Sequence, residues 1–140
     1  PGAVLIQTHQ PDSPLLQMLT RDDYPALMDR VLEERRPLQL PPFGYLAVVR
    51  SESADEAQAE QLLADLRRAI EGDAAGPVLI GPLPAPLARR ARRYRFQLLL
   101  KHPQRGPLHQ AAARTIKWLE QNAKSRTLRW SVDIDPQDFI

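Results

Sequence analysis

Cysteine is absent from the 140 residues, which excludes a disulfide framework, a thiolate nucleophile and a cysteine-based zinc site. No stretch approaches the roughly 20 apolar residues that a membrane-spanning helix needs, so we expect no membrane partner. Lysine is scarce, and the three lysines follow Leu100, Ile116 and Ala123. Because no lysine follows a glycine, the sequence has no Walker-type phosphate loop. We therefore expect that this chain does not hydrolyse ATP.

Acidic residues are missing between Ala74 and Leu119, a stretch that holds nine basic residues. The net charge of +2 hides this asymmetry: residues 1–73 have 13 acidic and 7 basic side chains (net −6), and residues 74–140 have 4 and 12 (net +8). Of the 19 basic residues, 16 are arginine, whose planar guanidinium suits phosphate and carboxylate. The basic half predicts contact with a polyanion. The alternative is a solvated arginine-rich surface.

The length suits one domain with an appendage. Residues 1–42 predict a short strand at 3–8, a helix from Pro14 capped by Asp12 or Ser13, and a second helix over 23–36. The Pro41-Pro42 pair reads as a stiff linker. One strand and two helices are too little for a core. Because the chain also begins without Met or a signal-peptide pattern, we expect the end of a larger domain, cut from a longer chain.

Residues 43–140 are more regular. We expect strands over 43–51, 77–81, 92–101 and 127–135, a helix opened by a capping box at Ser53 and Glu56, a proline-rich loop over 82–86 and a helix over 107–122. This βαββαβ order predicts an α+β, ferredoxin-like sandwich whose helices cover one face of the sheet. The first strand is mostly apolar on both sides, with Leu46 and Val48 on the open face, so we expect that face to dock on another part of a longer chain.

Signals for catalysis or metal binding are weak. His9, His102 and His109 form no ligand or triad pattern and read as surface histidines. Asp133, Asp135 and Asp138 predict a solvated strand end, with a cation site as the alternative. We expect no catalytic residue and no metal ligand in this chain.

The strongest functional signal is an arginine cluster before and within the strand over 92–101. Tyr94 and Phe96 alternate with its arginines, so we expect the two rings in the core rather than as stacking platforms. The arginines offer phosphate neutralisation. The predicted nucleic-acid-binding residues are Arg89, Arg90, Arg92, Arg93 and Arg95.

Several stretches occur together in the order of one family. They are Gly2-Ala-Val-Leu-Ile-Gln-Thr-His-Gln-Pro-Asp, Glu33-Glu-Arg-Arg, Leu40-Pro-Pro-Phe, Leu79-Ile-Gly-Pro-Leu-Pro-Ala-Pro, Arg93-Tyr-Arg-Phe-Gln-Leu-Leu-Leu and Trp130-Ser-Val-Asp-Ile-Asp-Pro. The chain thereby resembles the C-terminal end of the bacterial PriA family (primosomal protein N′), the replication-restart DNA helicases. The resemblance implies that residues 1–42 end the second helicase lobe and that residues 43–140 form a C-terminal domain similar to ribosomal protein S-ten. The ATP and magnesium site and the structural zinc of these ATP-dependent 3′–5′ superfamily 2 helicases lie upstream, so the resemblance implies no cofactor here.

The resemblance also implies partners. They are DNA forks and single strands, upstream helicase domains of the same chain, and the C-terminal tail of single-stranded DNA-binding protein. The resemblance further implies a monomer that works in the bacterial cytoplasm and nucleoid. The family's tail-binding arginine follows a His-Pro-x turn, which matches Arg105, and a family glutamine four residues later is His109 here. The alternative for Arg105 is a surface residue at a helix start. For the whole chain, the alternatives are a free-standing ribosomal or RNA-binding ferredoxin-like protein and a small enzyme.

Overall fold

The computed structural model describes residues 3–21, 23–73 and 75–137. Its internal contacts divide the chain into two compact units, residues 1–38 and residues 39–140. The helicase-lobe origin that the sequence suggests for residues 1–42 stays a prediction.

The first unit contains the two expected helices, α1 (Pro14–Thr20) and α2 (Tyr24–Arg35). Asp23 caps α2, because its carboxylate accepts a hydrogen bond from the Ala26 backbone amide at 3.2 Å. The strand expected over residues 3–8 is wrong, since this segment is irregular and leaves Val4 88% and Leu5 96% exposed. A strand needs a hydrogen-bonding neighbour, and the described part of this unit has no sheet for the segment to join.

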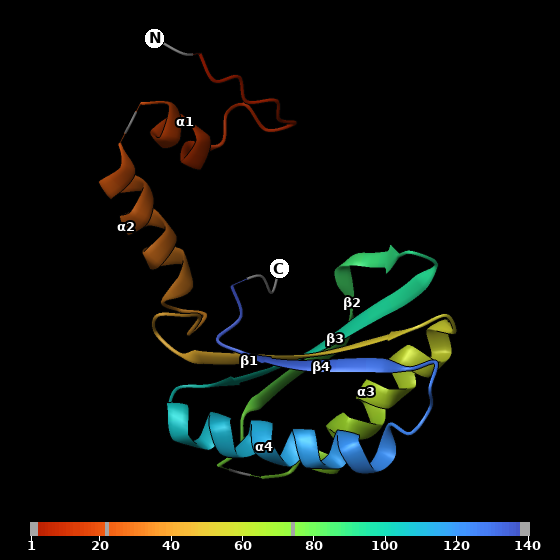
Figure 1. Ribbon diagram of the computed structural model, residues 1–140. Coiled ribbons are helices and arrows are strands. Elements are labelled where there is room, and N and C mark those ends of the chain that lie inside the picture. Colours follow the sequence, from red (N-terminus) through yellow and green to blue (C-terminus); the bar gives the residue numbers. More distant parts are fainter. Residues whose placement is uncertain (1–2, 22, 74, 138–140) are drawn as a thin grey trace. The chain divides into compact units, whose positions relative to one another are not determined.

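The second unit is built on a four-stranded antiparallel sheet of strand order β2-β3-β1-β4. Its elements are β1 (Tyr45–Ser53), α3 (Glu56–Ile70), β2 (Val78–Arg90), β3 (Arg93–His102), α4 (Arg105–Asn122) and β4 (Arg129–Ile134). Helices α3 and α4 lie on the same face of the sheet (Figure 1). The expected α+β class and the βαββαβ element order are confirmed.

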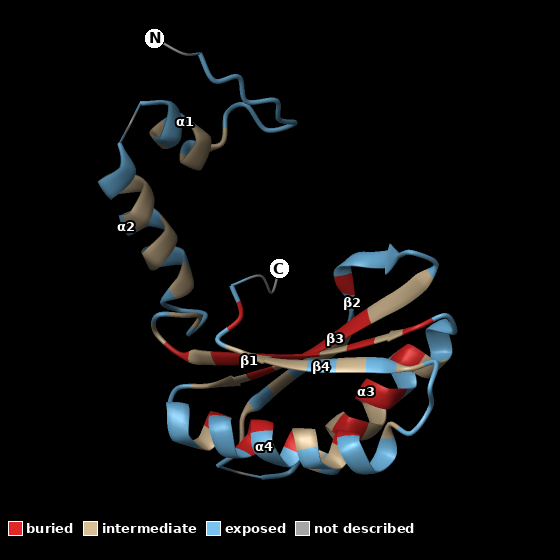
Figure 2. Ribbon diagram, in the orientation of Figure 1, coloured by how far each residue is buried: buried red, intermediate tan, exposed pale blue. Residues whose placement is uncertain are grey.

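The core lies between this face and the two helices, as the buried segments of Figure 2 show. The alternating pattern of β3 is confirmed: Phe96, Leu98 and Leu100 are buried in the core, and Tyr94 packs against it. The remaining core side chains come from β1, α3 and α4 and are Ala47, Val49, Ala59, Leu62, Leu63, Leu66, Leu108, Ala111 and Leu119.

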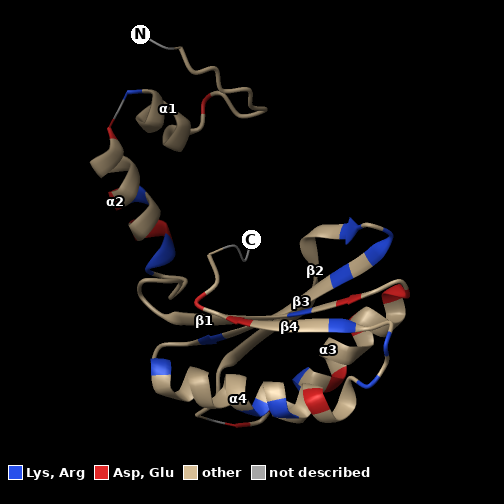
Figure 3. Ribbon diagram, in the orientation of Figure 1, with Lys and Arg blue, Asp and Glu red and all other residues tan. Residues whose placement is uncertain are grey.

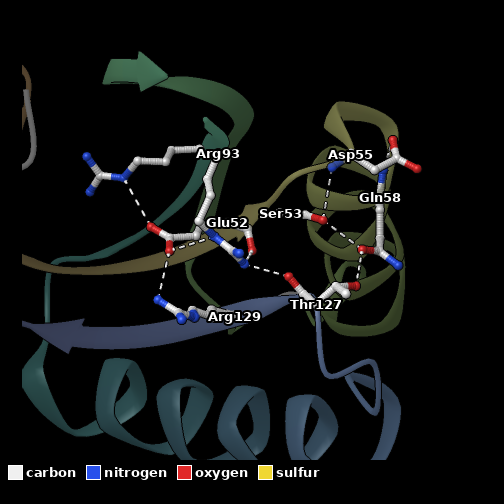
Figure 4. Close-up of polar contacts among 8 residues, drawn as sticks. Glu52, Ser53, Asp55, Gln58, Arg93, Thr127 and Arg129 are labelled. Atoms are coloured by element: carbon white, nitrogen blue, oxygen red, sulfur yellow. Dashed lines mark hydrogen bonds and ion pairs between the residues drawn. The ribbon is translucent and has the colours of Figure 1, made fainter. Parts of the chain in front are cut away.

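Two local expectations need correction. The N-cap of α3 is Asp55, whose carboxylate accepts from the Gln58 amide at 3.4 Å. Ser53 instead lies at the end of β1, where it accepts from the Asp55 amide and donates to the Gln58 side chain (Figure 4). The proline-rich segment 82–86 belongs to β2 rather than to a loop. β2 is an edge strand, where proline is tolerated because one side of the strand makes no ladder hydrogen bonds, and its pairing with β3 shifts register twice on the way to Arg90.

The apolar centre of the sheet face that carries no helix is buried. Leu46 and Val48 are 0% exposed. The Asp135 amide donates to the Leu46 carbonyl at 2.9 Å, which extends the pairing of β1 and β4 by one residue. The chain then turns onto this side of the sheet (Figure 1), and Pro136 is buried. The expectation that these two side chains require cover from another domain therefore loses its basis. A strand apolar on both sides indicated cover, but the sequence did not show that the chain itself supplies it.

Candidate nucleic-acid interface

The β2–β3 hairpin presents the arginine cluster. It turns through Ala91 and Arg92, whose φ angles are +50° and +61°, with Arg90 and Arg93 as the closing pair. Both turn residues have the left-handed conformation of a type I′ turn, which joins two twisted strands without splaying them. Arg90 and Arg92 are exposed at the tip, and Figure 3 shows basic residues on both arms of the hairpin.

Arg89 lies beside this tip and is held by an aromatic ring. Its guanidinium carbon is 5.1 Å from the centre of the Tyr94 ring, a distance typical of a cation–π contact. Because Tyr94 packs against the core, the ring fixes the arginine relative to the sheet while Arg89 stays exposed.

Arg93 and Arg95 differ from the other three arginines because they lie on the open face beside Glu52. Arg93 Nε is 3.0 Å from Glu52 Oε1, and Arg95 Nε is 3.8 Å from Glu52 Oε2. Arg129 of β4 also approaches Glu52, with Nη1 at 3.6 Å from Oε1 (Figure 4). The five predicted arginines thus form two groups: an exposed tip of Arg89, Arg90 and Arg92, and a half-buried pair bound to a carboxylate.

Sequence reasoning missed Glu52 and Arg129. The register places Glu52 directly opposite Arg95 on one neighbouring strand and Arg129 on the other, so opposite charges face each other across the ladder. This signal could be read from the sequence only once the strand order and register were known. A further ion pair, Arg50 to Asp133 at 3.2 Å, joins β1 to β4.

The second candidate site lies at the start of α4. Arg105 is the first residue of this helix, and its Nε donates to His109 Nε2 at 3.3 Å, so the structure brings together the two predicted residues. Arg105 Nη2 also lies 3.9 Å from Asp135 Oδ2, a contact that the sequence did not reveal.

The acidic strand end is engaged by arginines. Asp133 pairs with Arg50 and Asp135 with Arg105, while Asp138 lies outside the described residues. Among the residues that the structure describes, no group of three or more His, Cys, Asp or Glu side chains could hold a metal ion. Within the same residues, no helix is long and apolar enough to cross a membrane.

The sheet, its two covering helices and the exposed basic tip define an α+β domain with an arginine-rich hairpin. Residues 36–137 match the family described as "Primosomal protein N C-terminal domain". Over 139 residues, the chain is 37% identical to the replication restart protein PriA of Haemophilus influenzae, and this alignment covers 99% of this chain and 19% of that protein. It is also 35% identical over 104 residues to PriA of Synechocystis (74% of this chain, 12% of that protein) and 29% identical over 139 residues to PriA of Bacillus subtilis (97% and 17%).

The chain therefore belongs to the PriA family and matches its C-terminal domain. It spans less than one fifth of the length of each of these three relatives. The resemblance that the sequence motifs indicated is confirmed.

Proposed function

We propose that this chain is a non-catalytic DNA-binding and partner-docking module of a replication restart protein. The observation that carries the proposal is the exposed position of Arg89, Arg90 and Arg92 at the tip of a hairpin, in a chain that belongs to the PriA family. Three exposed guanidiniums held by a tight turn and an aromatic ring suit contact with a phosphate backbone, which is independent of sequence. The order β2-β3-β1-β4 supports a ferredoxin-like, S-ten-like domain.

The same proposal places the activity of the longer protein upstream. ATP hydrolysis, 3′–5′ unwinding, magnesium and structural zinc belong to helicase domains preceding this chain, for which residues 1–42 form the end of the second lobe. The working protein is a monomer in the bacterial cytoplasm and nucleoid. In it, DNA forks and single strands contact the hairpin.

The second partner is the acidic tail of single-stranded DNA-binding protein. Arg105 and His109 form a hydrogen-bonded pair in the first turn of α4, where unpaired backbone amides and the positive end of the helix dipole favour a carboxylate. Arg105 supplies the charge-assisted contact to the terminal carboxylate of the tail. His109 lies one helical turn along and flanks the last side chain.

The DNA proposal is tested by the salt dependence of binding. A variant with Arg89→Ala, Arg90→Ala and Arg92→Ala is compared with wild type for binding a fluorescent oligothymidine at several salt concentrations. Each phosphate contact contributes about 0.7 log units of affinity per log unit of salt for single strands, so the variant should bind more weakly and its slope should fall by up to about 2.

A matched variant removes three exposed basic residues elsewhere on the domain, Lys117, Lys124 and Arg126. It has the same net charge as the hairpin variant and should keep a slope close to that of wild type. Equal losses in the two variants would show that only net charge matters, and an unchanged slope in the hairpin variant would remove the tip from the interface. An oligouridine of equal length tests the alternative of an RNA-binding protein.

A further inference from the structure

Three arginines from two strands surround a single carboxylate on the open face of the sheet. Glu52 lies on the central strand β1 between Arg93 of β3 and Arg129 of β4 (Figure 4). Arg95, also on β3, is the direct register partner of Glu52. The site therefore holds three positive charges and one negative charge, and the Glu52 side chain keeps 30% of its surface exposed.

The carboxylate satisfies only part of this cluster. Arg93 is fixed in place, because its Nη2 donates to the backbone carbonyls of Glu52 and Thr127. Arg95 and Arg129 approach the carboxylate only to 3.8 and 3.6 Å, beyond the usual length of a hydrogen bond. A structural ion pair needs one arginine, and Arg129 is 73% exposed, so burial does not force it to this position.

A hollow opens at the same place. Its volume is about 240 Å³, and its walls include Glu52, Arg95, Arg129 and the Ser131 residue of β4. Because one water molecule occupies about 30 Å³ of liquid, the hollow has room for a phosphate group and several waters. Arg93, which pairs with the same carboxylate, is also the register partner of Arg90 at the hairpin tip.

From these observations we infer that the arginines around Glu52 form a phosphate-binding site, and that the Glu52 carboxylate occupies this site as an internal competitor. A backbone phosphodiester offers two non-bridging acceptor oxygens that can meet the forked donors of these guanidiniums at hydrogen-bond distance, whereas the Glu52 carboxylate stays 3.8 and 3.6 Å from Arg95 and Arg129. The inference rests on the proposed function, since the phosphate it expects is that of the nucleic-acid backbone. Binding then exchanges the contacts of Glu52 for those of a phosphate.

The decisive variant is Glu52→Gln, which keeps the size of the side chain and removes its charge. We expect it to bind the fluorescent oligothymidine about tenfold more tightly than wild type, the effect of one added charge-assisted contact, with a salt slope steeper by about 0.7. Glu60→Gln is the matched control, because Glu60 is exposed on α3 and loses the same charge. It should change affinity less than twofold, as expected for a distant surface charge, and an equal gain in both variants would overturn the inference.

A second pair of variants removes an arginine instead. Arg129→Gln should weaken oligothymidine binding, whereas Arg114→Gln should not, although Arg114 also pairs with a carboxylate, Asp73 at 3.0 Å. Arg129 is largely exposed, so this pair decides the question if Glu52→Gln fails to fold. Equal effects of the two arginine variants would overturn the inference.

Inorganic phosphate separates this inference from the proposed function. In chloride, Glu52→Gln should unfold at a lower temperature than wild type, because three arginines have lost their shared carboxylate. Phosphate at equal ionic strength should restore that temperature in Glu52→Gln and leave Glu60→Gln unchanged. Restoration without oligothymidine binding by wild type would support the site and contradict the proposed function. If wild type binds oligothymidine but phosphate does not restore the unfolding temperature of Glu52→Gln, the result would contradict the phosphate site and support the proposed function.

Discussion

The turn of the β2–β3 hairpin predicts that stability and binding can be changed in opposite directions. Ala91 and Arg92 have φ angles of +50° and +61°, and a left-handed conformation costs an L-residue about 1–2 kcal/mol. Asn-Gly is the preferred pair for this turn. The double variant Ala91→Asn, Arg92→Gly should relieve about 2 kcal/mol of strain or more, and the greater freedom of glycine in the unfolded chain should offset about 0.5–1 kcal/mol of this gain.

We therefore expect the free energy of unfolding to rise by about 1 kcal/mol, measured by urea denaturation. For a folded unit of about 100 residues, this corresponds to an increase of roughly 4–8 °C in the melting temperature. The same variant loses one tip arginine, so its affinity for oligothymidine should fall and its salt slope should decrease by about 0.7.

Two single variants separate the causes. Ala91→Asn should raise stability slightly and leave binding unchanged, whereas Arg92→Lys should keep both the strain and the charge. A double variant that is less stable than wild type would refute the strain argument. One that is more stable and binds oligothymidine as before would refute the role of Arg92.

Two further predictions concern a helix interior and the partner site. The Thr115 hydroxyl is buried in α4 without a hydrogen-bond partner among the described residues, so Thr115→Val should raise the free energy of unfolding by about 1 kcal/mol in urea denaturation, whereas Thr115→Ser, which keeps the hydroxyl and loses a methyl, should lower it. Arg105→Ala should weaken binding of a peptide with the acidic tail of single-stranded DNA-binding protein about tenfold in calorimetry, and Arg105→Glu should weaken it more. His109→Gln, which restores the residue implied by the family resemblance, should keep the affinity. The peptide binding is measured with this chain and with a chain extended by the proposed helicase part. Binding within twofold of wild type in both Arg105 variants would remove that residue from the site.

The fold of the second unit was predictable because its elements carry strong periodic signals. The alternation from Tyr94 to Leu100 fixed the buried side of β3, and the leucines of α3 fixed its covering face. The strand expected over residues 3–8 failed because a strand depends on a neighbour that local sequence does not reveal. The proline-rich part of β2 was misread for the related reason that proline excludes only the interior of a sheet and is tolerated at its edge.

The candidate sites were predictable to a lesser extent. Arginine composition singled out five residues that the structure places on the β2–β3 hairpin, and the family resemblance singled out Arg105. Neither signal identified Glu52 or Asp135, since each acidic residue meets its arginines through the register of the sheet or the path of the chain after β4. Cross-strand partners of this kind are set by tertiary structure, and the residues concerned are far apart in sequence.

These two acidic residues have a common physical consequence. Each candidate anion site already holds a carboxylate: Glu52 among three arginines and Asp135 beside Arg105. In the exchange that we propose for Glu52, and in a similar one at Arg105, the bound anion replaces this contact, so the free energy of binding is the difference between two ion pairs rather than the full value of one. When no ligand is bound, the resident carboxylate pairs with the guanidiniums and limits their mutual repulsion. It also favours ligands that engage several arginines at once, because a polyanion with regularly spaced charges can exchange more than one contact, whereas an isolated anion must displace a carboxylate already tethered in place.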